Sequence, residues 1–194
     1  NLLILDYGSG NIKSVYNSLN FVLNKVDNKH KIIVSNSITD VSKSDGIILP
    51  GVGSFQNCKE NIYKYKGLAD ALLENIFIQS KPFLGICVGM QLLANYGLEN
   101  GKHQGFGWID GKVKPLENEI KLSNNNLKIP HMGWNNLKIL TKDNIFENIN
   151  NNDQFYFVHS YFFDADDEEN IIATTNYGKN IPSIIKRKNI YGLQ

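Results

Sequence analysis

A short apolar run that ends in Gly-x-Cys-x-Gly constrains the fold of this chain more than any other feature. Residues 82–95 read Pro-Phe-Leu-Gly-Ile-Cys-Val-Gly-Met-Gln-Leu-Leu-Ala-Asn. The residues before the cysteine are typical of a buried strand, and those after it are typical of a helix. The pattern predicts a strand, a sharp turn with Cys87 at its apex and a helix, which is the arrangement of a nucleophile elbow. Gly85 and Gly89 bracket the apex, where a strained turn needs small residues.

The position of Cys87 also predicts its chemistry. At a helix N-terminus, the partial positive charge of the helix favours the thiolate over the thiol. The N–H of Val88 would point the same way and help to stabilise an oxyanion. The alternative is a structural cysteine buried in a turn, and the glycines on both sides of Cys87 disfavour it.

Strands and helices alternate in the first half of the chain. Asn11 is placed to cap a helix that starts at Ile12, and a second helix is predicted over residues 68–78. This order predicts an α/β fold, a flavodoxin-like doubly wound sheet that is mostly parallel. The loops at Gly8, Gly51 and Gly85 follow strands, so we expect all three at the carboxyl edge of the sheet. The predicted strands are residues 2–5, 31–34, 46–49 and the run before Cys87.

After residue 100, short β-like runs separated by turn residues predict added, partly antiparallel strands. No linker, repeat or hinge interrupts the sequence, so we expect a single domain over residues 1–194. The runs are residues 105–109, 112–114, 137–140, 155–163, 171–175, 183–188 and 189–193.

Composition excludes several classes of function. The formal net charge of +1 argues against a nucleic-acid surface, and no apolar run approaches the ~20 residues that span a membrane. Two cysteines, Cys58 and Cys87, provide no disulfide framework, and a nucleophilic thiol favours a reducing cytoplasm. No Cys/His cluster has the spacing of a zinc site, so we expect neither a metal nor another cofactor.

The elbow resembles that of the class I glutamine amidotransferases, which carry Gln four residues after the nucleophilic Cys. Gln91 occupies that position, and Glu99 matches the family's Glu that binds the substrate amino group. The segment Pro50-Gly51-Val52-Gly53 resembles the family's oxyanion loop. The resemblance implies that Cys87 is the nucleophile and that the N–H groups of Val88 and Gly53 form the oxyanion hole.

Further segments at residues 6–11, 105–107, 130–135 and 156–161 resemble one subgroup of this family. Its members are glutaminase subunits that pass ammonia to a (β/α)8 synthase subunit, as a heterodimer, in histidine biosynthesis. For glutamine binding, the resemblance implies Gly51, Val52, Gln91, Glu99, His159, Ser160 and Tyr161. For the surface that faces the synthase subunit, it implies Asn11 together with the loop residues His131, Met132 and Trp134.

The family's catalytic triad is Cys-His-Glu, with His and Glu in a Phe-His-Pro-Glu segment after a strand that resembles residues 189–194. The sequence ends at Gln194, immediately before such a segment. We therefore expect a truncated C-terminus, with the catalytic His and Glu beyond Gln194. His159 is a poor substitute as the base, because it lies within an apolar strand pattern.

Two other functions stay open from the sequence. One is a paralogous glutaminase that supplies ammonia for surface-sugar biosynthesis by the same half-reaction, which genomic neighbours would distinguish. The other is a non-catalytic regulatory protein built on the same cysteine elbow. A Phe-His-Pro-Glu segment beyond Gln194 would exclude this second alternative.

Overall fold

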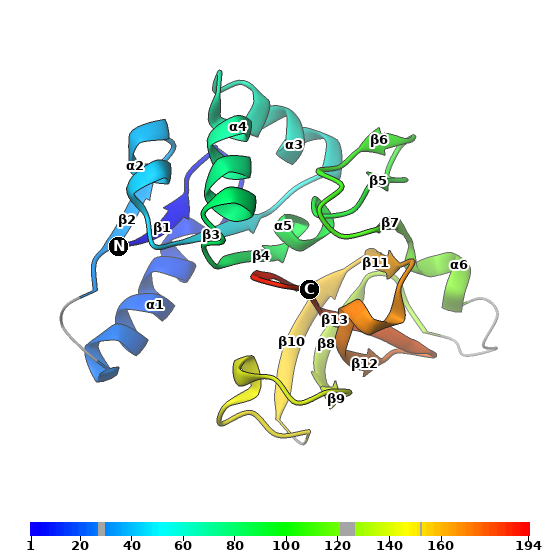
Figure 1. Cartoon of the computed structure of the whole chain (residues 1–194). Helices are drawn as coiled ribbons and strands as arrows, with labels where there is room; N and C mark the ends of the chain where they lie inside the picture. Colours follow the sequence, from blue (N-terminus) through cyan, green and yellow to red (C-terminus); the bar gives the residue numbers. More distant parts are fainter. Residues whose placement is uncertain (27–29, 121–126, 152) are drawn as a thin grey trace.

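The computed structural model describes residues 1–26, 30–120, 127–151 and 153–194. Within them, eight strands form the main sheet (Figure 1). The first five strands in the order below run parallel, and the last three continue the sheet in antiparallel pairs. Across the sheet they are β2 (Ile32–Ser35), β1 (Leu2–Leu5), β3 (Gly46–Gly51), β4 (Phe83–Cys87), β14 (Ile190–Leu193), β13 (Asn180–Arg187), β12 (Ile171–Asn176) and β9 (Lys138–Ile139).

Helices cover both faces of the parallel strands. Figure 1 shows α1 (Ile12–Val26) on one side of these strands, with α2 (Ile38–Lys43), α3 (Phe55–Tyr63) and α4 (Leu68–Leu73) on the other. The α2–α4 side holds the main core, because alternate strand residues such as Leu3 and Leu49 meet the buried faces of these helices. The remaining helical segments are the π-helix η1 (Glu74–Ile78), α5 (Val88–Gln91), α6 (Leu116–Ile120) and the 3-10 turns η3 (Asn144–Phe146) and η4 (Glu168–Asn170).

Two smaller sheets lie beyond the main one. The first is an antiparallel ribbon of β8 (His131–Asn136) and β10 (Gln154–His159). The second has four strands, in the order β11 (Tyr161–Ala165), β7 (Gly111–Pro115), β5 (Tyr96–Gly97) and β6 (His103–Gln104). No helix in the described part of the chain is long and apolar enough to cross a membrane.

The predicted fold class is confirmed: an α/β fold whose mostly parallel sheet carries added antiparallel strands. The predicted cap is also present, since the side chain of Asn11 accepts from the Ser14 N–H at 3.2 Å. The helix predicted over residues 68–78 changes to π-helical spacing at Glu74. There the buried Asn75 donates its amide to the carbonyl of Val41 on α2.

Three predictions for the second half are wrong. Residues 105–109 form an irregular turn, because the N–H groups of Phe106 and Gly107 bond to carbonyls just after α5. Residues 155–163 do not form one strand, since the chain leaves β10 at Ser160 and enters β11 in a different sheet. Residues 131–134 are not a loop, because they pair with β10 as part of β8.

The elbow between β4 and α5 packs backbone against backbone. Gly51 at the end of β3 is the register partner of Cys87. A Cβ on Gly89 would stand 1.9 Å from the Leu49 carbonyl oxygen, and one on Gly85 would stand 2.4 Å from the Gly89 carbonyl oxygen. Only glycine allows these approaches, so the two glycines hold the turn against the centre of the sheet.

Replacing Gly89 with alanine is therefore expected to reduce the free energy of unfolding by about 3 kcal/mol or more, because the added methyl overlaps a backbone atom. The matched control is Gly8→Ala. Gly8 has a φ of +83° and nothing within 4 Å of an added Cβ. It should cost only about 1 kcal/mol for the left-handed backbone. Urea unfolding of both variants makes the comparison, and equal losses would contradict the packing argument.

Candidate active site

A cavity of about 420 Å³ opens at the carboxyl edge of the parallel strands, beside the elbow. It collects residues from the loop after β3, the elbow, the β5–β6 connection and the junction of β10 with β11. Gly51 adjoins it as the register partner of Cys87. The structure thus brings together the residues expected to bind glutamine and its oxyanion. The lining is Val52, Gly53, Cys87, Val88, Gln91, Glu99, Pro130, Val158, His159, Ser160 and Tyr161.

Cys87 has φ 55° and ψ −114°, the strained backbone of an elbow apex. Burial raises the pKa of its thiol above the ordinary value. The Val88 N–H and the Gln194 side chain lower the pKa only in part, and the nearby Cys58 raises it further. The expected thiolate is therefore wrong for the resting site, because burial disfavours the charged form more than the bonds from Val88 and Gln194 favour it. The nucleophile needs a base to remove its proton.

Gln194 contacts the nucleophile, and the sequence did not identify it as a site residue. Its amide nitrogen lies 3.8 Å from Cys87 Sγ, and its amide oxygen accepts from Gln91 Nε2 at 3.0 Å. Gln91 Nε2 also donates to the Tyr161 carbonyl at 3.3 Å. A polar residue at the carboxyl end of the strand beside the elbow strand is the signal that could have found it.

Glu99 anchors the start of α3, directly after the loop that carries Gly53. Its Oε2 accepts from the N–H of Phe55, the first residue of α3, at 2.7 Å. A carboxylate has two oxygens with several lone pairs, so this bond leaves acceptor capacity for an ammonium group in the cavity. Both its position and its charge suit the predicted role.

His159 lines the cavity with both ring nitrogens engaged. Its Nδ1 lies 2.9 Å from the Tyr161 carbonyl, which can only accept, so Nδ1 carries the proton. Its Nε2 then accepts from Nδ1 of His131 at 2.9 Å. Burial lowers the pKa of both rings, that of His131 to about 4, so the pair is neutral at pH 7. These bonds agree with the prediction that His159 is not the base.

The prediction that His131 faces a partner needs correction, because its side chain is only 2% exposed. It stacks between Phe157 and Tyr177. The reason is the strand periodicity of β8, which turns residue 131 inward and its neighbours Met132 and Trp134 outward. Those two are 58% and 67% exposed, and Asn11 is also exposed.

Met132 and Trp134 belong to a larger apolar strip. Their register partners on β10 are Val158 and Tyr156, which are 54% and 53% exposed. The rings of Trp134 and Tyr156 meet edge to face at 5.5 Å. Val158 also lines the cavity, so this apolar strip extends from the surface to the mouth of the site.

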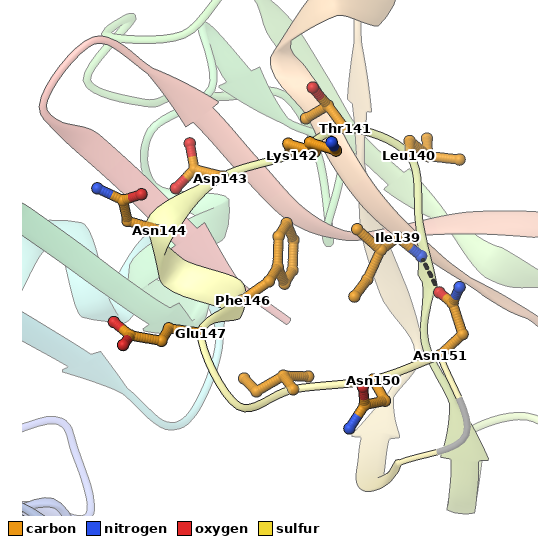
Figure 2. Close-up of a pocket in the computed structure, with 11 residues that line it drawn as sticks. Ile139, Leu140, Thr141, Lys142, Asp143, Asn144, Phe146, Glu147, Asn150 and Asn151 are labelled. Carbon is orange, nitrogen blue, oxygen red and sulfur yellow. Dashed lines mark hydrogen bonds between the residues drawn. The ribbon is translucent and has the colours of Figure 1, made fainter.

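A larger hollow of about 610 Å³ lies elsewhere, around the segment 139–151 (Figure 2). Figure 2 shows Phe146 pointing into it and the Ile139 N–H bonded to the Asn151 side chain at 2.7 Å. Its lining contains neither cysteine nor histidine. Across the described ranges, no group of three or more His, Cys, Asp or Glu could hold a metal ion.

The raised pKa of Cys87 predicts that alkylation of this thiol by iodoacetamide accelerates only at a pH above the midpoint of an ordinary cysteine, because the thiolate is the reactive form. Gln194→Leu removes a donor to the sulfur and should move the midpoint higher still. Mass spectrometry of the Cys87 peptide distinguishes this thiol from the buried Cys58. The control is Gln104→Leu, at an exposed position on β6. If the pH midpoint of alkylation were lower in Gln194→Leu than in the unmodified protein, the contact between Gln194 and the sulfur would be contradicted.

Comparison with known proteins places this geometry in a family. The model of the class-I glutamine amidotransferase family matches residues 3–194. Two solved glutamine amidotransferases share the fold. The first has a TM-score of 0.72 and 12% sequence identity, and the match covers 100% of this chain and 88% of the other chain. The second, from Thermotoga maritima, has a TM-score of 0.61 and 17% sequence identity, and the match covers 100% of this chain and 74% of the other chain.

Curated relatives are more similar in sequence. The imidazole glycerol phosphate synthase subunit HisH of Pelagibacter ubique is 43% identical over 194 residues, which are 100% of this chain and 90% of the relative. That of Rhodospirillum rubrum is 39% identical over 192 residues, covering 98% and 88%. The chain therefore belongs to the class-I glutamine amidotransferase family and, within it, to the HisH proteins.

Proposed function

We propose that this chain is the glutaminase subunit of an imidazole glycerol phosphate synthase. The observation that carries the proposal is the thiol of Cys87 at a strained apex, in a cavity that also holds Gly53, Val88 and Glu99. In the reaction, Sγ bonds to the side-chain amide carbon of glutamine. The carbon–nitrogen bond breaks, ammonia leaves with the thiol proton, and water hydrolyses the γ-glutamyl thioester to glutamate.

The proposal gives the remaining roles to other residues in or beside the cavity. The N–H groups of Val88 and Gly53 hold the oxyanion of the tetrahedral intermediate, and one such donor contributes roughly 3 kcal/mol. Glu99 binds the ammonium group of the substrate, since it presents the negative charge at that wall of the cavity. Gly51, Val52, Gln91 and the His159–Tyr161 segment complete the glutamine site.

The group that removes the thiol proton of Cys87 is not His159. His159 has both ring nitrogens in hydrogen bonds, and the thiol is neutral at rest. We assign the base and its orienting carboxylate to a His and a Glu beyond Gln194. Supporting this, β14 runs parallel to β4, and its end brings Gln194 to the sulfur.

Ammonia passes to a HisF-type (β/α)8 synthase subunit in a heterodimer. Support comes from the names of the relatives and from the apolar strip of Met132, Trp134, Tyr156 and Val158, which adjoins the cavity. Asn11 contributes to the same interface. Residues 1–194 act as one glutaminase domain, and the two free cysteines suit the cytoplasm.

The nucleophile is tested in the full-length subunit assembled with its synthase partner. Cys87→Ala should lower glutamine-dependent synthesis on the order of 10³-fold or more, because no other group forms the thioester. Synthesis from added ammonium salt should be unchanged, since external ammonia bypasses the glutaminase. Steady-state assays with each nitrogen donor decide the matter, and equal loss of both activities in an intact complex would refute the assignment.

The interface is tested by Trp134→Ala. Removing a large exposed aromatic anchor should weaken binding to the synthase subunit by about 2 kcal/mol, or roughly 30-fold in Kd, measured by titration calorimetry. The control is Ile78→Ala. Ile78 is 72% exposed but precedes β4, at the opposite edge of the sheet. An unchanged Kd in Trp134→Ala would show that the synthase subunit does not bind at this strip.

A further inference from the structure

Two buried side chains that the thiol chemistry does not use lie beneath the loop Pro50–Gly53. The hydroxyl of Tyr7 donates to the Pro50 carbonyl at 2.9 Å, and the thiol of Cys58 donates to the Val52 carbonyl at 3.5 Å. Tyr7 is 1% exposed and Cys58 is 0% exposed. Both are weak acids whose pKa burial raises, so both keep their protons and act as donors.

These donors act on peptide groups of the proposed oxyanion loop. The Val52 carbonyl and the Gly53 N–H belong to one trans peptide, so they point in opposite directions. While Cys58 holds the carbonyl toward the core, the Gly53 N–H must point away from the core. Gly53 lines the cavity of Cys87.

The Val52–Gly53 peptide lies in an open part of the loop. Val52 is 61% exposed, and Gly53 has a φ of +115° with nothing within 4 Å of an added Cβ. The loop is held tightly on both sides, however. At Gly51 an added Cβ would stand 2.5 Å from the Gly89 nitrogen, and Phe55 is bonded to Glu99. The Val52–Gly53 peptide therefore lies between two fixed residues, Gly51 and Phe55. The Cys58 thiol contacts this peptide on its core side, through the Val52 carbonyl.

We propose that Tyr7 and Cys58 are positioning residues that orient the Pro50–Gly53 loop and that Cys58, through the Val52 carbonyl, sets the direction of the Gly53 N–H. The proposal rests on the proposed glutaminase function for its consequence in catalysis. Tyr7 holds the peptide that enters the loop, and Cys58 holds the peptide that bears the oxyanion donor. Gly10 packs against the same loop, because an added Cβ there would stand 2.9 Å from the Pro50 oxygen.

The test compares Cys58→Ala, which removes the donor, with Cys58→Ser, which keeps one, in the full-length subunit with its partner. An oxyanion donor acts in the transition state, so Cys58→Ala should lower glutamine-dependent kcat about tenfold, with KM changed less than twofold. Cys58→Ser should restore most of the kcat. Tyr7→Phe should lower kcat in the same direction, and ammonia-dependent synthesis should not change.

The structural control is Ile62→Val, a buried change on the same helix that removes no donor. It should reduce stability and leave kcat unchanged. A second readout needs no turnover: the Gly53 amide should change its NMR shift and exchange faster in Cys58→Ala, and keep both in Ile62→Val.

Wild-type kcat in Cys58→Ala with an unmoved Gly53 amide would overturn the proposal, and so would a Cys58→Ser variant as slow as Cys58→Ala. Failure of the glutaminase assignment looks different. In that case Cys87→Ala would keep full glutamine-dependent activity, while the Gly53 amide would still report whether Cys58 positions the loop.

Discussion

The site depends on one constraint, the contact of bare backbone between β3, β4 and the start of α5. Gly51, Gly85 and Gly89 leave no room for a Cβ, with the tightest approach at the Leu49 carbonyl oxygen. This contact places the apex of the elbow beside the end of β3. Cys87 and the Pro50–Gly53 loop therefore meet because of main-chain packing, before any side chain of the pocket contributes.

Polar side chains then define the cavity, mostly by binding the backbone. Glu99 holds the start of α3, Tyr7 and Cys58 hold two carbonyls of the loop, and His159 holds the Tyr161 carbonyl. Each bond satisfies a backbone group in a segment that contributes to the cavity or adjoins it. The same burial desolvates the Cys87 thiol and raises its pKa, so the thiol rests in its neutral form.

Local patterns predicted the parallel half and the elbow, because apolar runs, caps and glycine positions are encoded within a few residues. The residues expected at the site came mainly from motifs shared with a known family, and most of them line one cavity. The strand β8 was not predicted, because Gly133 and Asn135 interrupt the alternation of apolar and polar residues. Its structure depends on pairing with β10. The burial of His131, the contact of Gln194 and the pKa of Cys87 likewise depend on residues far away in the sequence.

The Gln194 contact has a consequence for self-recognition. The group beside the nucleophile is a carboxamide, the same chemical group that the proposed reaction cleaves. Its nitrogen donates to the sulfur, while its oxygen is held by the side chain of Gln91. The protein thus tolerates a copy of its substrate's reactive group next to its own thiol. The scaffold amide differs from the cleavable one in its orientation, which Gln91 maintains.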